Sequence, residues 1–478
     1  MKYKRSAAML AFVGVLSACG GGGGGGGSSP PIGSTPTPTP PPTGASCSLA
    51  DRQAWVAGEI REWYLFPETL PATNPVGAAT LSDFVDAMTA TARAQRRDRF
   101  FTYVTSIAEE NAFFQQGASA GFGIRLSIDS AQRRLFIAEA FEGAPALAAG
   151  IDRGTEILAI GTSSANLRTV DSIIAAEGSA GITNALGPST VGTTRVLRIS
   201  DAAGVREVTV TKADFALTPV SSRYGARIID DGGRRVGYVN LRTFIDTADP
   251  ALRNAFAQFR AQGITEVIVD LRYNGGGLVS IGELLGDLLG ANRVGQVFSR
   301  TVFRPEKAAN NSTDQFGAQP QAIASTKIAF IGTGGTASAS ELVINSFIPY
   351  LGANAALVGT NTYGKPVGQI ARDRPACDDR LRVVAFATQN SAGQGAYFDG
   401  LAPFMQATCR AGDDLTFQLG DPREASVRSA LDFLAGRVCT PIAAAPAAGR
   451  QAAQAEAPRE LVSPMRPSPA QREVPGFF

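Results

Sequence analysis

The sequence predicts an α/β protein built from several domains, with the mixed α+β character of a multidomain chain. Its 478 residues suffice for about two or three domains, and the 44% of apolar residues supply a sizeable core. In the second half of the chain, short apolar runs alternate with amphipathic stretches: 267–270 precedes 278–289, and 327–331 precedes 341–348. This alternation is typical of strands and helices that follow one another around a largely parallel sheet.

Ser338 is the candidate nucleophile. It lies in a loop rich in Gly, Thr, Ala and Ser that joins the strand expected at 327–331 to the helix expected from Glu341. A serine at such a turn is close to unpaired backbone N–H groups and to the positive end of the helix dipole. Capping of the helix by Ser338 or Ser340 is the commoner role for serines at this position.

The chain contains no histidine. This excludes a Ser-His-Asp triad and every zinc site that uses histidine. A lysine or a carboxylate must therefore activate a hydroxyl nucleophile. Lys365 is the candidate, because a βαβ return through the strand expected at 355–358 would bring it beside the Ser338 loop. Lys365 could act as a base only if burial lowers its pKa; a lone lysine at a strand end is otherwise ordinary surface.

Ser338-Ala339-Ser340-Glu341, followed by Gly364-Lys365 and then Gln369, resembles the carboxyl-terminal processing (tail-specific) serine peptidases. The resemblance implies that Ser338 is the nucleophile, Lys365 the general base and Gln369 the residue that orients Lys365. It also implies a ClpP/crotonase-like catalytic core, and it covers most of residues 50–438. Pro366 departs from the glycine expected after the lysine, and the interval between serine and lysine is slightly long.

A glycine-rich turn at 275–277 follows the strand expected at 267–270. Three glycines there could cradle a phosphate, but the lysine of a P-loop is missing, so a nucleotide is not expected. The resemblance instead implies an oxyanion hole formed by the N–H groups of Gly276 and Ala339, with Gly275 or Gly277 as alternatives to Gly276. The glycines could also serve only the backbone angles of the turn.

The motif Gly121-Phe122-Gly123-Ile124, together with the later run at 149–161, resembles a PDZ domain spanning 118–214. Glycine-flanked loops of this kind present bare N–H groups to a carboxylate, and an open sheet edge accepts a peptide as an added strand. Gly121, Phe122, Gly123 and Ile124 are the expected peptide-binding residues.

The first 19 residues have the layout of a secretory signal peptide, with basic residues, an apolar run and small residues in order. Residues 16–19 resemble a bacterial lipobox, which implies that Cys19 is lipidated. The alternative is an ordinary signal peptide with an incidental cysteine. Gly20 follows instead of an aspartate, which favours a periplasm-facing lipoprotein of the outer membrane, and residues 20–46 are expected to be a Gly/Ser/Pro/Thr-rich linker.

Four further cysteines are expected to form two disulfides in an oxidising compartment. Of the three possible pairings, Cys47 with Cys439 and Cys377 with Cys409 is the one favoured here. A metal site is the alternative, but no close C-x-x-C pair occurs. No metal and no cofactor are expected.

The expected domains are an N-terminal helical region at 47–117, the PDZ domain at 118–214, the catalytic domain at 215–440 and a disordered tail at 441–478. The formal net charge of +2, without a dense basic run, gives no reason to expect nucleic acid as a partner. The expected partners are protein or peptide substrates recognised through their C-termini, and contact with a membrane is expected only through the lipid anchor.

The predicted function is that of a serine endopeptidase that cleaves exported proteins through an acyl-enzyme on a Ser/Lys dyad. Two alternatives remain open. One is a lipoprotein that captures peptides through its PDZ domain and carries a vestigial serine site. The other is acyl transfer or hydrolysis of small esters on the same core. The sequence does not identify an adaptor or an oligomeric state.

Overall fold

The computed structural model describes residues 46–442 and 459–478. The predicted signal peptide, Cys19 and nearly all of the predicted linker fall outside these ranges. Within them, no helix combines the length and the apolar character needed to cross a bilayer.

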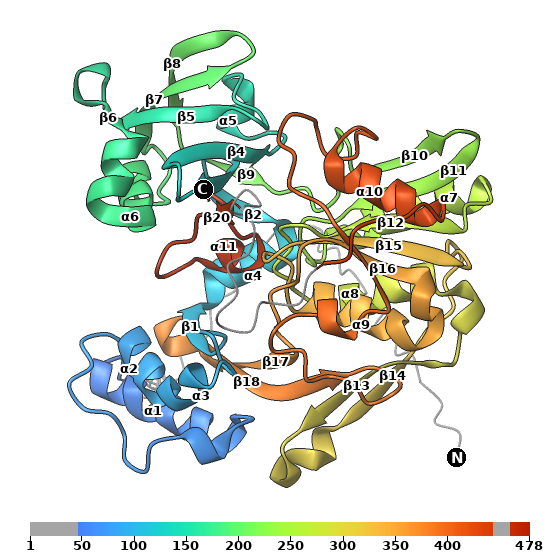
Figure 1. The fold of residues 1–478 in the computed structure, drawn as a ribbon. Coiled ribbons are helices and arrows are strands. Elements are labelled where there is room, and N and C mark those ends of the chain that lie inside the picture. Colours follow the sequence, from blue (N-terminus) through green and yellow to red (C-terminus); the bar gives the residue numbers. More distant parts are fainter. Residues whose placement is uncertain (1–45, 443–458) are drawn as a thin grey trace, which may run out of the picture. The chain divides into compact units, whose positions relative to one another are not determined.

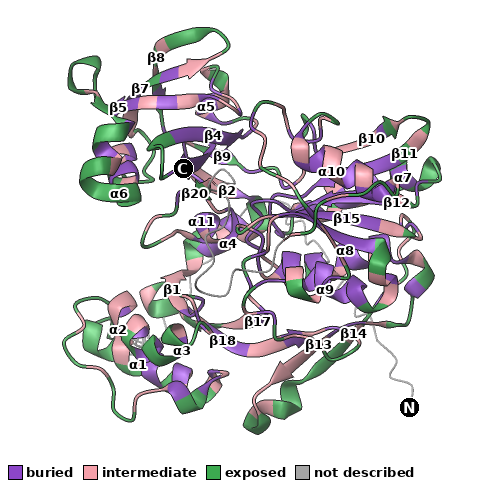
Figure 2. Cartoon of the chain, viewed as in Figure 1, coloured by how far each residue is buried: buried purple, intermediate pink, exposed green. Residues whose placement is uncertain are grey.

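A six-stranded sheet forms the centre of the fold (Figure 1). Its strands, in spatial order, are β10 (Ala226–Asp231), β11 (Arg234–Asn240), β12 (Glu266–Asp270), β15 (Lys327–Gly332), β16 (Ala355–Gly359) and β19 (Ala407–Arg410). Only β10 and β11 pair antiparallel; the remaining neighbours are parallel. Parallel strands are covered on both faces, which explains why β12 and β15 read as continuous apolar runs (Figure 2).

Helices cover both faces of this sheet. α7 (Ala248–Ala261), α8 (Val279–Leu289) and α9 (Ala339–Leu351) share one apolar core with one face, and α10 (Ala425–Leu434) packs on the other. The alternation of strands and helices predicted for this part of the chain is confirmed.

One helix boundary differs from the prediction. α9 was expected to end ahead of Pro349, but it continues to Leu351. Proline frees the carbonyl four residues before it, here that of Asn345. Asn390 Nδ2 donates to that carbonyl at 3.2 Å, so the helix continues without leaving it unpaired.

A second sheet carries the strand that follows Lys365. It contains β1 (Tyr103–Ser106), β18 (Asp379–Gln389), β13 (Val297–Phe303) and β14 (Ser312–Gln315), and β17 (Val367–Arg374) also pairs with β18. The N-terminal helices α1 (Leu49–Trp63), α2 (Leu81–Met88) and α3 (Ala90–Ala94) share an apolar cluster with β17 and β18. The predicted helical region therefore exists, with β1 as an added strand before α4 (Ile107–Gln116).

Residues 118–216 form a third, mainly antiparallel sheet with its own core, which we call the 118–216 region. Its strands are β3 (Ile124–Asp129), β4 (Arg134–Ala140), β5 (Glu156–Gly161), β6 (Arg168–Thr169), β7 (Thr194–Asp201) and β8 (Gly204–Thr211), and its helices are α5 (Pro145–Ala148) and α6 (Val170–Leu186). β2 (Ala118–Gly121) pairs with β9 (Ala213–Ala216), so the region begins and ends at one place.

The prediction that residues 441–478 are disordered is wrong for 459–478. This segment contains β20 (Glu460–Leu461), which extends the third sheet beside β3, and α11 (Pro469–Glu473). Its composition lacks periodicity, but Val474, Phe477 and Phe478 are each at most 3% exposed. Tertiary packing orders the segment, and a local pattern could not reveal that.

The predicted disulfide pairing is also wrong. The structure joins Cys47 to Cys377 and Cys409 to Cys439. Cys47 precedes α1, and Arg52 of that helix forms an ion pair with Asp379 at the start of β18. Cys409 lies on β19, beside the chain that leaves α10, where Arg410 N–H donates to Thr440 O. Chain order alone did not show which elements are neighbours.

We expect the two disulfides to contribute unequally to stability. The first closes a loop of 330 residues and the second a loop of 30. Loop-closure entropy makes the longer bridge more stabilising by about 2 kcal/mol. Replacing Cys47 and Cys377 with serine should therefore lower the urea midpoint more than replacing Cys409 and Cys439, and the reverse order would contradict this assignment.

Candidate active site

Ser338 occupies a sharp turn between β15 and α9. Its φ of +56° and ψ of −118° are rare for a residue with a side chain and costly unless the surroundings enforce them. The turn is enforced partly by Gly276, which has a φ of +118°. A Cβ on Gly276 would lie 2.7 Å from Ser338 Cβ, so the glycine permits the two loops to touch.

Glu341 joins the serine loop to the lysine loop. Its side chain is fully buried in the first turn of α9. Its carboxylate accepts hydrogen bonds from Ser338 N–H (3.1 Å), Gly364 N–H (2.7 Å) and Lys365 N–H (2.7 Å). Burial raises the pKa of Glu341, and these N–H donors oppose that rise. One carboxylate thus fixes the backbone of both predicted dyad residues.

Lys365 lies in an apolar part of the site. Its Nζ is 5.2 Å from the centre of the Phe101 ring. Removal of the amine from water lowers the pKa of Lys365 below that of an exposed lysine. Lys365 is half-buried, so the removal from water that a lysine base requires is present in part.

The loop before Lys365 is held from the N-terminal region. The Arg99 guanidinium donates to the carbonyls of Tyr363 (2.8 Å) and Gly364, and it stacks over the Tyr363 ring at 4.1 Å. The turn that carries Arg99 is itself fixed by the buried Asp98, which accepts from Phe101 N–H at 2.7 Å.

Gln369, predicted to orient the lysine, lies on β17 and lines the same cleft as Lys365. Its Nε2 donates to the Phe101 carbonyl at 2.8 Å. The amide thus positions the residue whose ring contacts the lysine, so its link to Lys365 in this structure runs through Phe101.

The glycine-rich turn lies against Ser338. A Cβ on Gly276 would be 3.1 Å from Ala339 N, which places these two backbones side by side. The Gly276 N–H donates to the Asn274 side chain at 2.9 Å. The neighbouring Gly275 N–H donates to the carbonyl of Glu473 at 2.9 Å, so this turn already binds a peptide carbonyl.

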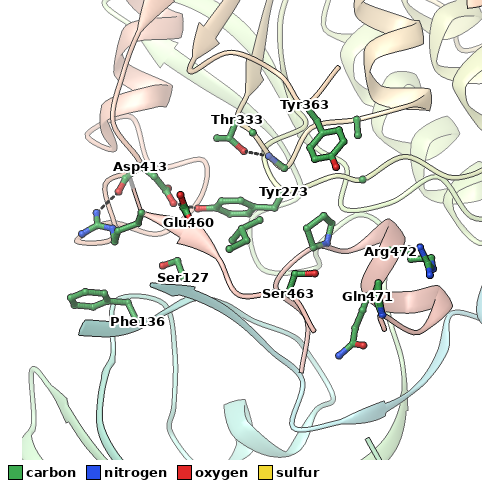
Figure 3. Close-up of a pocket in the computed structure, with 18 of the residues that line it drawn as sticks. Ser127, Phe136, Tyr273, Thr333, Tyr363, Asp413, Glu460, Ser463, Gln471 and Arg472 are labelled. Carbon is green, nitrogen blue, oxygen red and sulfur yellow. Dashed lines mark hydrogen bonds between the residues drawn. The ribbon is translucent and has the colours of Figure 1, made fainter. Parts of the chain in front are cut away.

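These elements border a cleft of about 2310 Å³. Lys365, Gln369, Gly275 and Ala337 line it from the central part of the fold. Figure 3 shows Ser127 and Phe136 of the 118–216 region on one side and Tyr273, Thr333 and Tyr363 on the other. The segment 459–478 also lines the cleft, through residues that include Gln471 and Arg472.

Buried ion pairs connect the 118–216 region to the rest of this site. Arg242, after β11, contacts Glu139 at 2.7 Å, and both side chains are at most 2% exposed. Arg153 contacts Asp413 at 2.9 Å and donates to the Tyr273 hydroxyl at 3.1 Å. Breaking one partner of such a pair leaves an uncompensated buried charge, so these contacts specify how the region joins the cleft.

The loop predicted to bind peptides contacts the end of segment 459–478 of this chain. The N–H groups of Gly123 (2.9 Å) and Ile124 (3.1 Å) both donate to the main-chain oxygen of Phe478. A Cβ on Gly121 would lie 2.9 Å from the Phe478 carbonyl carbon, so the close approach depends on glycine there. Phe122 does not face the ligand backbone in this way; its ring is buried in the core of the region.

Sequence reasoning assigned no role to Glu341, Arg99 or the segment 459–478. A signal for Glu341 was present, because Ser338 and Glu341 have the spacing of a capping box, in which the glutamate reaches back to the N–H of the first residue. The structure contains that contact. No local pattern marked Arg99 or the C-terminal segment as neighbours of the site.

We expect Glu341→Gln to disturb the site although it is nearly isosteric. An amide has one acceptor oxygen and would turn its NH₂ group toward at least one of the three N–H donors. One unpaired buried donor costs about 1–3 kcal/mol in the free energy of unfolding. Urea unfolding would measure this loss, with Glu306→Gln at an exposed position as the control. Equal stability of the two variants would contradict the role given to Glu341.

Residues 235–404 match the family described as Peptidase family S41. The chain is 28% identical over 322 residues to carboxyl-terminal-processing peptidase 3, chloroplastic, of Arabidopsis thaliana, covering 65% of this chain and 58% of that protein. It is 27% identical over 251 residues to the carboxyl-terminal-processing protease of Synechocystis, covering 52% and 53%. The chain thus spans rather more than half the length of these relatives.

A crystal structure of a candidate S41 protease from Bacteroides fragilis superposes with a TM-score of 0.61 at 23% identity, covering 80% of this chain and 97% of that one. At this identity the likeness concerns the fold. The chain is therefore similar over part of its length to carboxyl-terminal processing peptidases, and its fold is like that of the S41 protease structure.

Proposed function

We propose that this protein is a serine endopeptidase of the carboxyl-terminal processing class. The observation that carries the proposal is the arrangement around Glu341, which fixes the Ser338 loop and the Lys365 loop to one carboxylate. The match to peptidase family S41 spans both loops. A lysine with a lowered pKa, whose loop is joined to that of the serine, is what a hydroxyl nucleophile needs in a chain without histidine.

In the proposed mechanism, neutral Lys365 takes the proton from Ser338 Oγ while Oγ attacks the scissile carbonyl carbon. The negative charge that develops on the carbonyl oxygen is stabilised by the N–H of Ala339 and by an N–H of the 275–277 turn. Each aimed donor contributes about 3 kcal/mol. The protonated lysine then gives its proton to the leaving amine, and a water activated by Lys365 hydrolyses the acyl-enzyme.

Which glycine completes the oxyanion hole depends on hydrogen bonds that exist before substrate binds. The Gly276 N–H would first have to break its hydrogen bond to the Asn274 side chain, whereas the Gly275 N–H already donates to a main-chain carbonyl, that of Glu473. We retain Gly276 with Ala339 as the proposed pair, because these two backbones lie against Ser338.

We further propose that the 118–216 region is a PDZ domain that recognises substrate C-termini. Its support is the pair of N–H groups of Gly123 and Ile124 aimed at one main-chain oxygen, together with the β3 edge, which here pairs with another segment of this chain. A periplasm-facing, outer-membrane lipoprotein anchored through Cys19 is proposed from the sequence only.

We expect Ser338→Ala and Lys365→Ala to abolish cleavage of an unfolded test protein, with a loss of at least about 10³-fold, because nucleophile and base act as a unit. Lys307→Ala is the matched control, since its ammonium pairs with the largely exposed Glu62 and lies over the Trp63 ring, apart from the residues that line the cleft. Full proteolysis by Ser338→Ala would contradict the assignment. If no form cleaves the test protein, including the protein with Ser338 and Lys365 intact, and C-terminal peptides bind tightly, the peptide-capture protein is favoured.

The rate should rise with pH. The neutral amine of Lys365 is the active form, so kcat/KM increases as pH rises through the pKa of that amine. Burial lowers this pKa, and the midpoint should therefore fall below the value of about 10.4 typical of an exposed lysine. A pH profile of kcat/KM measures the midpoint. A rate that is independent of pH, or that falls as pH rises toward the midpoint, would exclude Lys365 as the base.

A further inference from the structure

The segment 459–478 occupies the outer edge of β3 with both of its ends. Val462 N–H donates to Leu126 O at 3.1 Å, and Leu126 N–H donates to Gly476 O at 2.8 Å. Phe478 N–H donates to Ile124 O at 2.9 Å. The segment therefore uses the main-chain groups that an incoming peptide strand would use.

The last two residues fill apolar space in the 118–216 region. Phe478 is 3% exposed and belongs to the core that contains Phe122 and Ile124. Phe477 packs against the rings of Phe141 and Phe215, at centroid distances of 5.4 and 5.8 Å. An aromatic side chain is thus the group that this pocket accommodates.

The middle of the segment lies on the proposed catalytic machinery. The Glu473 carbonyl accepts a hydrogen bond from Gly275 N–H, and a Cβ on Gly275 would be 2.3 Å from Arg472 O. The Arg472 guanidinium stacks 3.6 Å over the Tyr103 ring. Glu473 is 8% exposed, and within the described residues its Oε2 has no hydrogen-bond partner.

We propose that segment 459–478 is a tethered ligand of this chain's own peptide site and excludes other peptides from β3 and the cleft. Peptides that place an aromatic side chain in the pocket of Phe478 compete with it. The proposal rests on the proposed function of that site. A tethered ligand acts at an effective concentration in the millimolar range. The apparent affinity for a free peptide is therefore the intrinsic affinity multiplied by the fraction of molecules whose site is unoccupied.

The negative charge of Glu473 favours the protonated, inactive form of Lys365. Its carboxylate raises the pKa of Lys365 against the lowering effect of burial, as Asp98 does more weakly, whereas Arg472 and Arg382 lower it. Displacing the segment removes Glu473 and Arg472 together, and Glu473 is the stronger of the two influences.

The first test is binding of a fluorescent peptide with the sequence of residues 468–478, measured by polarisation. All proteins carry Ser338→Ala, so that cleavage cannot consume the peptide. We compare the full chain, a chain ending at residue 458, and Phe478→Ala, with Met465→Ala as the control because that side chain of the same segment is 87% exposed. Circular dichroism checks that each protein is folded.

We expect the shortened chain and Phe478→Ala to bind the peptide at least about tenfold more tightly than the full chain, and Met465→Ala to match the full chain. A peptide with its final Phe changed to Asp should not bind. Equal binding by the full and shortened chains, or no binding by the shortened chain and Phe478→Ala, would overturn the proposal.

The second test uses chains with Ser338 intact and an unfolded protein as substrate. The shortened chain should cleave at least about tenfold faster than the full chain, and the 468–478 peptide added in trans should inhibit it. If Ser338→Ala is inactive but the full and shortened chains cleave equally, this inference fails while the proposed function stands. If none of the forms cleaves but the difference in peptide binding persists, the proposed function fails while the tethered ligand stands.

Discussion

The site depends on a single buried carboxylate. Glu341 satisfies three main-chain N–H groups that belong to two loops far apart in the chain, one before α9 and one before β17. A buried charge is tolerated only when it is fully hydrogen-bonded, so the two loops cannot move independently without leaving that charge exposed to an apolar interior. The same contact sustains the unfavourable backbone angles of Ser338, which no local preference would produce.

Around this contact, the site is assembled from every part of the described chain. The central sheet supplies Ser338 and the glycine-rich turn, the second sheet supplies Gln369, and the N-terminal region supplies Arg99 and Phe101. Buried pairs such as Arg242 with Glu139 join the 118–216 region to the strand end beside the cleft. Because these pairs are buried, the cost of removing their charges from water offsets much of their attraction. They therefore fix how the two parts are arranged but add little net stability.

Sequence reasoning captured the local features well. The strands and helices around the central sheet, the turn that carries Ser338 and the loop at Gly121–Ile124 each have a local signature of periodicity or glycine content, and the structure contains them. What failed depended on contacts between distant segments. Cys47 pairs with Cys377 because α1 packs beside β18, and the segment 459–478 is ordered because its phenylalanines enter the core of another region. Neither relation leaves a trace in the pattern of the residues themselves.

The N-terminal region supplies contacts to the site that the stretch matching the family lacks. The stretch that matches peptidase family S41, residues 235–404, contains Ser338, Glu341, Lys365 and Gln369. It does not contain Arg99, which holds the carbonyls before Lys365, or Phe101, whose ring shields the amine and whose carbonyl holds Gln369. The matched stretch on its own would thus contain these four residues but lack the contacts that Arg99 and Phe101 make with them and with the neighbouring backbone. In this protein the residues that match the family and the residues that contact the site are therefore different sets.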